Sequence, residues 1–181
     1  MSALNTNYLT PTGREEAWRF TPLKRLAGLH DSSTNVSENI SLSAISKLPN
    51  GVELAVAKAT DFPPSYTSTD VVTNRIRAEV KNISVLTIKK DMELDTPIFL
   101  SRKCGNTPEL SRVVIQAGEN SKSVVIIENN GTGEIGEEIE ISLATGASLN
   151  FISLQEWDRS AVDVGQHHAI LGRDAAFTSY V

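Results

Sequence analysis

Residues 113–128 read VVIQAGENSKSVVIIE, two β-branched runs joined by a small, polar corner. A similar strand and corner return at 139–148 (IEISLATGAS) and at 167–176 (HHAILGRDAA). A constant interval of 27 residues separates three of the corner positions: Gly118, Thr145 and Gly172. Such a period is typical of stacked repeats, in which each unit buries its apolar face against the next. The sequence therefore predicts a β-solenoid with about 27 residues per coil.

Small residues also align three positions after the first corner residue of each repeat. The predicted corner residues are Gly118, Ser121, Gly146, Ser148, Gly172 and Ala175. Turns between strands favour such residues, because they tolerate tight backbone conformations. We expect these residues to stack on one another along the solenoid.

The composition is that of a globular protein with a modest acidic excess. The chain has 181 residues, 40% of them hydrophobic, and a net charge of −5. This charge disfavours a general nucleic-acid or anionic-membrane surface. The N-terminal sequence has no apolar leader, and no stretch approaches the roughly 18 apolar residues of a membrane span. We expect a cytoplasmic protein that binds neither nucleic acid nor membrane.

Three regions follow from the pattern of apolar and polar residues. Residues 1–30 are predicted to be helical, with a capping box at Thr12–Glu15 and a second start at Thr21-Pro22, which gives helices at about 13–20 and 22–28. Residues 31–82 are a linker and mixed α/β region, and residues 83–181 are the β-helix core.

The middle region divides further. The serine-rich part at 31–50 is expected to be linker with one weak helical turn, 51–59 a strand, and 70–82 a helix.

The core region consists of short Val- and Ile-rich runs between polar corners. The run VVII at 124–127 predicts a strand covered on both faces. Alternation at 148–154 places Leu149, Phe151 and Ser153 on one face. The last residues, AAFTSYV, end inside a strand, so we expect an incomplete β-helix whose open end permits a homodimer.

A formal GxGxxG motif spans Gly131 to Gly136 after the run SVVIIE. A dinucleotide site would require a helix to begin there, so that its N–H groups face the pyrophosphate. Residues 137–143 instead alternate like a strand, and Glu137 and Glu138 would repel phosphate. We interpret Asn130-Gly131 as a turn, and a nucleotide-binding domain remains an unlikely alternative.

The remaining reactive side chains give weak signals. Cys104 is the single cysteine, so an internal disulfide is impossible. His167 and His168 are adjacent, and neighbours in a strand point to opposite faces, so we expect one to face the core and one to face outward. No catalytic residue and no metal site is predicted. Structural roles for all three residues are favoured, and their functions stay open.

The densest cluster of aromatic and basic residues lies at 14–26, REEAWRFTPLKRL. One interpretation is a helix that docks Trp18 and Phe20 on the body of the protein. The other is a recognition element, because Trp and Arg are frequent hot-spot residues at interfaces. The residues concerned are Glu16, Trp18, Arg19, Phe20, Thr21 and Pro22.

The stretch GREEAWRFTPLKRL closely resembles the N-terminal signature of the SufD branch of the SufB/SufD family of iron–sulfur cluster assembly proteins. The repeats VVIQAGENSKSVVIIE, GASLNFISLQEWD and HHAILGRDAAF resemble the coils of the core shared by SufB and SufD. The resemblance covers residues 13–28 and about 83–181.

This resemblance implies a right-handed parallel β-helix and a scaffold subunit that is not an enzyme. It implies pairing with a SufB-like subunit and a SufC-like ATPase, in a SufBCD complex that builds and delivers iron–sulfur clusters. The cluster is expected in the complex, with no cofactor bound by this chain. No cluster ligand is assigned to Cys104, His167 or His168.

An alternative is a β-solenoid carbohydrate-active enzyme, because such enzymes commonly use this architecture. It would require carboxylates that converge on a groove. The clustered candidates are Glu156, Asp158 and Asp163.

Overall fold

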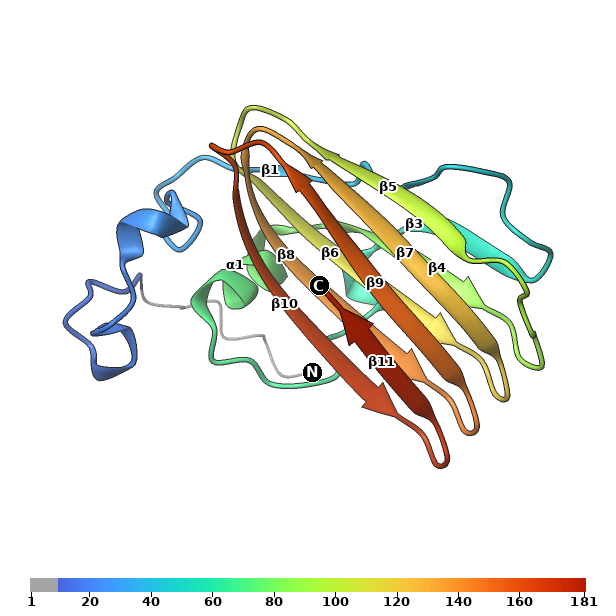
Figure 1. Ribbon diagram of the computed structural model, residues 1–181. Helices are drawn as coiled ribbons and strands as arrows, with labels where there is room; N and C mark the ends of the chain where they lie inside the picture. Colours follow the sequence, from blue (N-terminus) through green and yellow to red (C-terminus); the bar gives the residue numbers. More distant parts are fainter. Residues whose placement is uncertain (1–9) are drawn as a thin grey trace.

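The computed structural model describes residues 10–181 and has the predicted solenoid, with about four turns of about 27 residues each. Two sheets face each other along it (Figure 1). The first contains β3 (Val52–Lys58), β4 (Asn82–Ile88), β6 (Glu109–Ala117), β8 (Glu134–Leu143) and β10 (Val162–Leu171). The second contains β2 (Ser43–Ala44), β5 (Ile98–Cys104), β7 (Lys122–Gly131), β9 (Ser148–Trp157) and β11 (Ala176–Tyr180).

Neighbouring coils pair in parallel, so equivalent residues stack in columns. One such column joins Leu86, Ile115, Ile141 and Ala169 in the first sheet. The facing column of the second sheet joins Ile98, Val125 and Phe151. These side chains form the main core, and the predicted inward face of β9 is confirmed, because Leu149, Phe151 and Ser153 are all buried. Each strand therefore buries one face inside the coil, as alternation requires.

The corners contain one left-handed residue in each coil. These residues are Asp91, Asn120, Gly146 and Asp174, with φ between +55° and +70°. Their N–H groups bond across coils: that of Asn120 donates to Thr145 O at 3.0 Å, and that of Gly146 to Arg173 O at 2.8 Å. Asn, Asp and Gly are the residues that adopt this conformation at least cost.

The predicted corner alignment is wrong by one residue in the middle coil. The register stacks Ala117, Leu143 and Leu171, so successive coils here contain 26 and 28 residues. Ala144 therefore lies between Gly118 and Gly172, where Thr145 was expected. Similarly, Ala147 stacks between Ser121 and Ala175, and Ser148 is already the first residue of β9. Two unequal coils average to the interval seen in the sequence.

The end of the solenoid opposite to β10 and β11 is closed by antiparallel strands. β3 pairs with β4, and β2 pairs with β5. β1 (Ser37–Glu38) adds in parallel to β6. The expected linker with a helical turn at 31–50 is therefore incorrect, since two of its segments are short strands held by backbone hydrogen bonds to the solenoid. The predicted strand at 51–59 is confirmed as β3.

One α-helix is present in residues 10–181, α1 (Val71–Glu79). It covers the outer face of β6 and β8 and confirms the helix predicted at 70–82. Asp70 caps it, since its side chain accepts a hydrogen bond from the Thr73 N–H at 2.7 Å. A second core forms beneath it from residues that include Val72, Ile76 and Leu110. The expectation that VVII is covered on both faces is wrong, because Val124 and Ile126 are only half-buried and α1 covers the other sheet.

The N-terminal helices are shorter than predicted. Two 3₁₀ helices are present, Glu16–Trp18 and Leu23–Leu26, and neither has a side-chain cap. Of the capping box, the half in which the Thr12 N–H donates to the Glu15 carboxylate is present, at 3.0 Å. Residues 1–9 of the predicted helical segment lie outside the described residues. No helix of the described part is long and apolar enough to cross a membrane.

A substitution at Gly118 tests the tight contact between neighbouring coils. A Cβ there would lie 2.5 Å from the backbone N of Lys90 in the preceding coil. We predict that Gly118→Ala lowers the free energy of unfolding by about 1–3 kcal/mol, because backbone must move to admit the methyl group. Urea unfolding measures this. Glu119→Ala, at the exposed neighbouring position, should stay within about 0.5 kcal/mol of the parent, and equal effects of the two changes would contradict the prediction.

Candidate functional site

The interior of the solenoid changes from apolar to polar along its strands. In the second sheet, the column that follows Leu100 and Ile127 consists of Arg102, Asn129 and Gln155. The facing column of the first sheet consists of Ser111, Glu137 and Gly165. Polar side chains thus meet inside the coil at the end of the strands that lies away from the Gly118 corner. We call this group, with Asp163, Trp157 and His167, the interior polar cluster.

An ion pair across the interior joins the two sheets in this cluster. The Arg102 guanidinium donates from Nη1 to Glu137 Oε2, and both side chains are at most 2% exposed. His167 Nε2 lies 3.4 Å from the other oxygen, Glu137 Oε1. Burial alone would raise the pKa of Glu137, but Arg102 and His167 outweigh it and lower the pKa. Glu137 is therefore a buried carboxylate at neutral pH.

Several polar atoms of the cluster have no hydrogen-bond partner among the described residues. They are Arg102 Nε, Arg102 Nη2, Asn129 Oδ1 and Asp163 Oδ1. Buried donors and acceptors of this kind are normally satisfied by protein or water, because leaving them unpaired is costly. The cluster therefore has unused capacity to bind water or a small polar molecule.

A cavity of about 520 Å³ opens beside the cluster at the β10 end of the solenoid. Its walls are formed by Glu137, Gln155, Trp157, Asp163, Gly165, His167 and Val181. Trp157 Nε1 donates to Asp163 Oδ2 at 3.1 Å. Burial, and the neighbouring Glu137 carboxylate, raise the pKa of Asp163 to about 6. Two carboxyl groups in one cavity thus differ in protonation between about pH 4 and 6, where Asp163 holds a proton and Glu137 is ionised.

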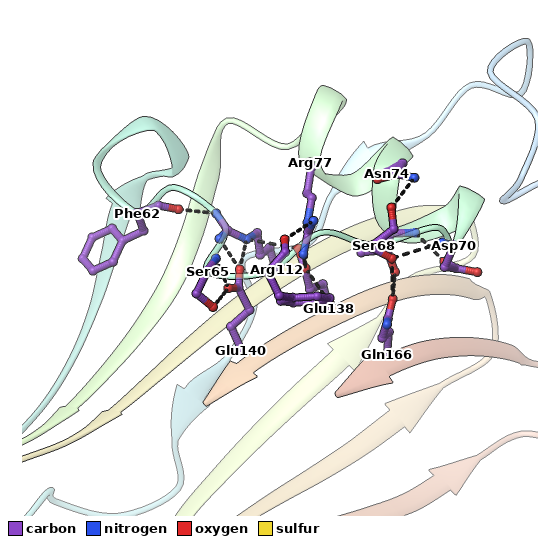
Figure 2. Close-up of polar contacts among 12 residues, drawn as sticks. Phe62, Ser65, Ser68, Asp70, Asn74, Arg77, Arg112, Glu138, Glu140 and Gln166 are labelled. Atoms are coloured by element: carbon purple, nitrogen blue, oxygen red, sulfur yellow. Dashed lines mark hydrogen bonds and ion pairs between the residues drawn. The ribbon is translucent and has the colours of Figure 1, made fainter. Parts of the chain in front are cut away.

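A second ionic network lies on the outer face of the same strand, β8 (Figure 2). Arg112 on β6 pairs with Glu138 at 3.1 Å and also with Glu140. Arg77 on α1 approaches Glu138 from above at 2.5 Å. Arg112 Nη1 also donates to the Phe62 carbonyl at 2.7 Å. This network fastens both the helix and the segment before it to the solenoid.

The segment at residues 62–70 crosses the outer face and is held by further polar contacts. Ser65 Oγ donates to Glu140 at 2.7 Å, and the Tyr66 hydroxyl donates to Glu138 at 3.0 Å. Ser68 Oγ lies 3.0 Å from Gln166 Oε1 on β10 (Figure 2). Burial raises the pKa of Glu140, whereas Arg112 and Ser65 lower it. The net effect is a lowered pKa. The two carboxylates on the outer face, Glu138 and Glu140, therefore take part in contacts that hold the fold together.

The two histidines lie on opposite faces of β10, as predicted. His167 points inward, with its ring edge-on to Phe151 at a centroid distance of 5.4 Å. His168 points outward and stacks on Tyr66 at 3.7 Å. The Arg77 guanidinium also lies over the Tyr66 ring, 4.3 Å from the ring centre. Period-two alternation in the sequence was sufficient to predict this separation.

Cys104 is buried at the polar end of β5. Burial, together with the nearby Glu109, raises the pKa of its thiol to about 12. A thiol in this state is a poor nucleophile and a poor metal ligand, because both roles require the thiolate. The structural role expected from the sequence fits this environment.

The glycine motif forms part of the solenoid. Residues Glu134–Leu143 are strand β8, so no helix begins after Gly136 and the dinucleotide alternative is excluded. The predicted turn at Asn130-Gly131 is misplaced by two residues: both residues still belong to β7, and the bend falls at Thr132-Gly133. Gly131 has φ +143° and packs against the Cys104 backbone, which explains the glycine.

The acids proposed for a carbohydrate-active enzyme do not form one group. Asp158 is exposed and accepts hydrogen bonds from the Ser160 N–H and hydroxyl, at 3.0 and 2.8 Å. Glu156 is also exposed, whereas Asp163 lies inside the cavity. Within residues 10–181, no group of three or more His, Cys, Asp or Glu side chains is arranged to hold a metal ion.

The N-terminal motif is divided between core and surface. Trp18 is half-buried and packs against the core beneath α1. Phe20 is 86% exposed, and Arg19 and Pro22 are also exposed. Glu16 forms a solvent-exposed ion pair with Arg19 at 3.9 Å, and Thr21 is half-buried. The docking interpretation is therefore correct for Trp18 and wrong for Phe20, and the recognition interpretation stays a prediction.

The sequence of this chain is similar to proteins of a known family. The family model described as "SUF system FeS cluster assembly, SufBD core domain" matches residues 99–181, from β5 to the end of the chain. From residue 99 onward, the solenoid is similar to the SufBD core domain. The matched part of the chain contains the whole interior polar cluster and all of β8.

Curated relatives carry the likeness over most of the chain. An iron–sulfur cluster assembly SufBD family protein of Mycobacterium leprae is 30% identical over 172 residues, which is 91% of this chain. A SufBD family protein of Mycobacterium tuberculosis is 28% identical over 171 residues. The chain spans 43% and 42% of the length of these two relatives. The likeness therefore extends well beyond residues 99–181 and includes α1.

The outer network yields a stability prediction. Arg112→Met should lower the free energy of unfolding by about 3–5 kcal/mol, because it leaves Glu140 buried without its cation. Lys122→Met removes an exposed ion pair with Glu93 and should change stability by less than about 1 kcal/mol. Urea unfolding of both variants measures the difference. A small effect of Arg112→Met would show that the network does not hold the 62–70 segment.

Asp163 yields a pH prediction. Because its pKa is raised when folded, the folded state binds more protons than the unfolded state between about pH 4 and 6, so this group costs stability as pH rises. We predict that Asp163→Asn stabilises the protein by on the order of 1–2 kcal/mol at pH 8 and has little effect at pH 4. Thermal unfolding at both pH values measures this.

Asp158→Asn is the matched control. The Ser160 N–H and hydroxyl lower the pKa of Asp158, so its effect has the opposite sign. This variant should be slightly less stable than the parent at pH 8. If both variants shift stability in the same direction at pH 8, the explanation for Asp163 fails.

Proposed function

We propose that this protein is the SufD-type scaffold subunit of a SufBCD-type iron–sulfur cluster assembly complex. It pairs with a SufB-like subunit and a SufC-like ATPase, and the cluster is the cargo of the complex. The observation that carries the proposal is the SufBD core match on a β-solenoid. The N-terminal sequence GREEAWRFTPLKRL favours the SufD branch. Such a complex works in the cytoplasm.

The scaffold role is consistent with how the chain uses its charged residues. Glu137, Glu138 and Glu140 are all engaged by arginines in buried pairs. Such pairs fix positions and are not free for acid–base catalysis. The glycine motif is a strand, so we assign ATP hydrolysis to the partner. The chain acts by presenting rigid surfaces.

The solenoid presents a surface that suits this role. Among residues 10–181, no helix covers the outer face of β7 and β9 (Figure 1). An exposed sheet face of this kind can receive a second subunit.

Co-expression tests this proposal. The tagged protein is produced with the SufB- and SufC-like proteins of the same host, and the purified material is analysed by size-exclusion chromatography. We expect a three-component complex whose ATPase activity depends on this chain. The SufC-like protein alone, and the pair without this chain, are the controls. Elution of this chain without partners, or a stoichiometric iron–sulfur chromophore on the chain alone, would overturn the proposal.

A further inference from the structure

The N-terminal segment at residues 14–25 presents a basic surface around an exposed phenylalanine. Phe20 is 86% exposed, the largest exposed fraction among the large hydrophobic side chains of the described residues. Arg14, Arg19, Lys24 and Arg25, all within six positions of it, are also exposed. In Figure 1 this blue segment projects from one side of the solenoid. We call it the Phe20 surface.

This surface is held in place by the fold. Arg75 on α1 is 1% exposed and donates to the carbonyl oxygens of Gly28 at 3.0 Å and Leu29 at 3.2 Å. Leu29 is fully buried, and Trp18 packs on the same core. Contacts with the core on both sides of Phe20, by half-buried Trp18 and buried Leu29, therefore hold the backbone that carries it. A side chain ordered in advance loses less entropy on binding, which favours its use as an interface anchor.

The phenylalanine also has a cation beside its ring. The Arg19 guanidinium lies 5.5 Å from the Phe20 ring centre. Exposed apolar side chains are individually common, so Phe20 alone would carry no argument. An aromatic ring with an arginine at its face, in a segment held by contacts with the core, has the composition of an interface hot spot.

The charges of the surface indicate the chemistry of its partner. Glu15 is occupied by the Thr12 and Gly13 N–H groups, at 3.0 and 2.9 Å, and Glu16 faces Arg19. Among residues 10–181, Arg14, Lys24 and Arg25 have no ion pair within 4.0 Å. The surface is therefore locally cationic, although the whole chain has a net charge of −5. Acidic groups complement it.

We infer that the Phe20 surface docks on an acidic protein surface that has an apolar pocket for the Phe20 ring. A lipid surface is disfavoured as the partner, because the two 3₁₀ helices are too short to form an amphipathic face. In addition, Phe20 is the single fully exposed aromatic side chain of the Phe20 surface. A nucleic acid is disfavoured by the acidic chain as a whole. This inference goes beyond the scaffold role and does not depend on which complex the protein joins.

Photocrosslinking in the producing cells tests the inference. Phe20→p-benzoylphenylalanine is introduced in the full chain, and the adduct is identified by mass spectrometry. The control is the same residue at Val56, which is 57% exposed on β3. We expect one protein adduct at position 20, absent at position 56, whose crosslinked peptide is rich in Asp and Glu.

Charge variants make the test specific. In the same background, Arg19→Glu with Arg25→Glu should lower the adduct yield at least about five-fold, because it reverses the local charge. Arg19→Lys with Arg25→Lys keeps the charge and should keep the yield within about two-fold. Raising the salt to about 0.5 M before irradiation of the lysate should also lower it, because surface charges are then screened.

Three results would overturn the inference. They are an adduct yield no higher than at Val56, a yield that does not respond to charge reversal, and adducts with lipid or nucleic acid in place of protein. The co-expression experiment above is separate: a protein that joins the three-component complex but gives no adduct at position 20 keeps the scaffold role and loses this one.

Discussion

Strand β8 buries carboxylates on both of its faces, and the rest of the structure is arranged around this constraint. Glu137 points into the solenoid, whereas Glu138 and Glu140 point outward beneath α1. A buried carboxylate without a cation would cost several kcal/mol, so each requires an arginine. Arg102 supplies the inner partner from β5, and Arg112 and Arg77 supply the outer ones. One strand therefore ties the opposite sheet and the covering helix together.

This arrangement separates two kinds of polar residue in the same protein. The outer network fastens α1 and the 62–70 segment, as its hydrogen bonds show (Figure 2). Its Glu138 Oε2 has no hydrogen bond within the described residues but lies 3.1 Å from Arg112 Nε. The interior polar cluster retains unpaired atoms and opens on a cavity. Polar groups that hold a fold together are normally satisfied. The interior polar cluster, with four such unpaired atoms, therefore has more capacity for a ligand than the outer network, where Glu138 Oε2 still faces Arg112.

Several features were predictable because they depend on neighbouring residues alone. Alternation placed His167 and His168 on opposite faces, and it identified β8 as a strand where a glycine motif suggested a helix. Other features failed because they depend on contacts between coils. The middle corner moved by one residue, and the 31–50 region gained strands, since pairing with a distant coil decides both.

The sequence by itself determined the solenoid, because both the repeat interval and the small corner residues can be read from the order of residues along the chain. It also marked the N-terminal motif as unusual, although it left open whether the motif docks or is exposed. Only the tertiary structure decided that Trp18 packs inward and Phe20 does not. It likewise decided that Glu137 pairs with Arg102, 35 residues away. The physical reason is that stacking brings together side chains from different coils, and their pairing depends on a register that no local pattern contains.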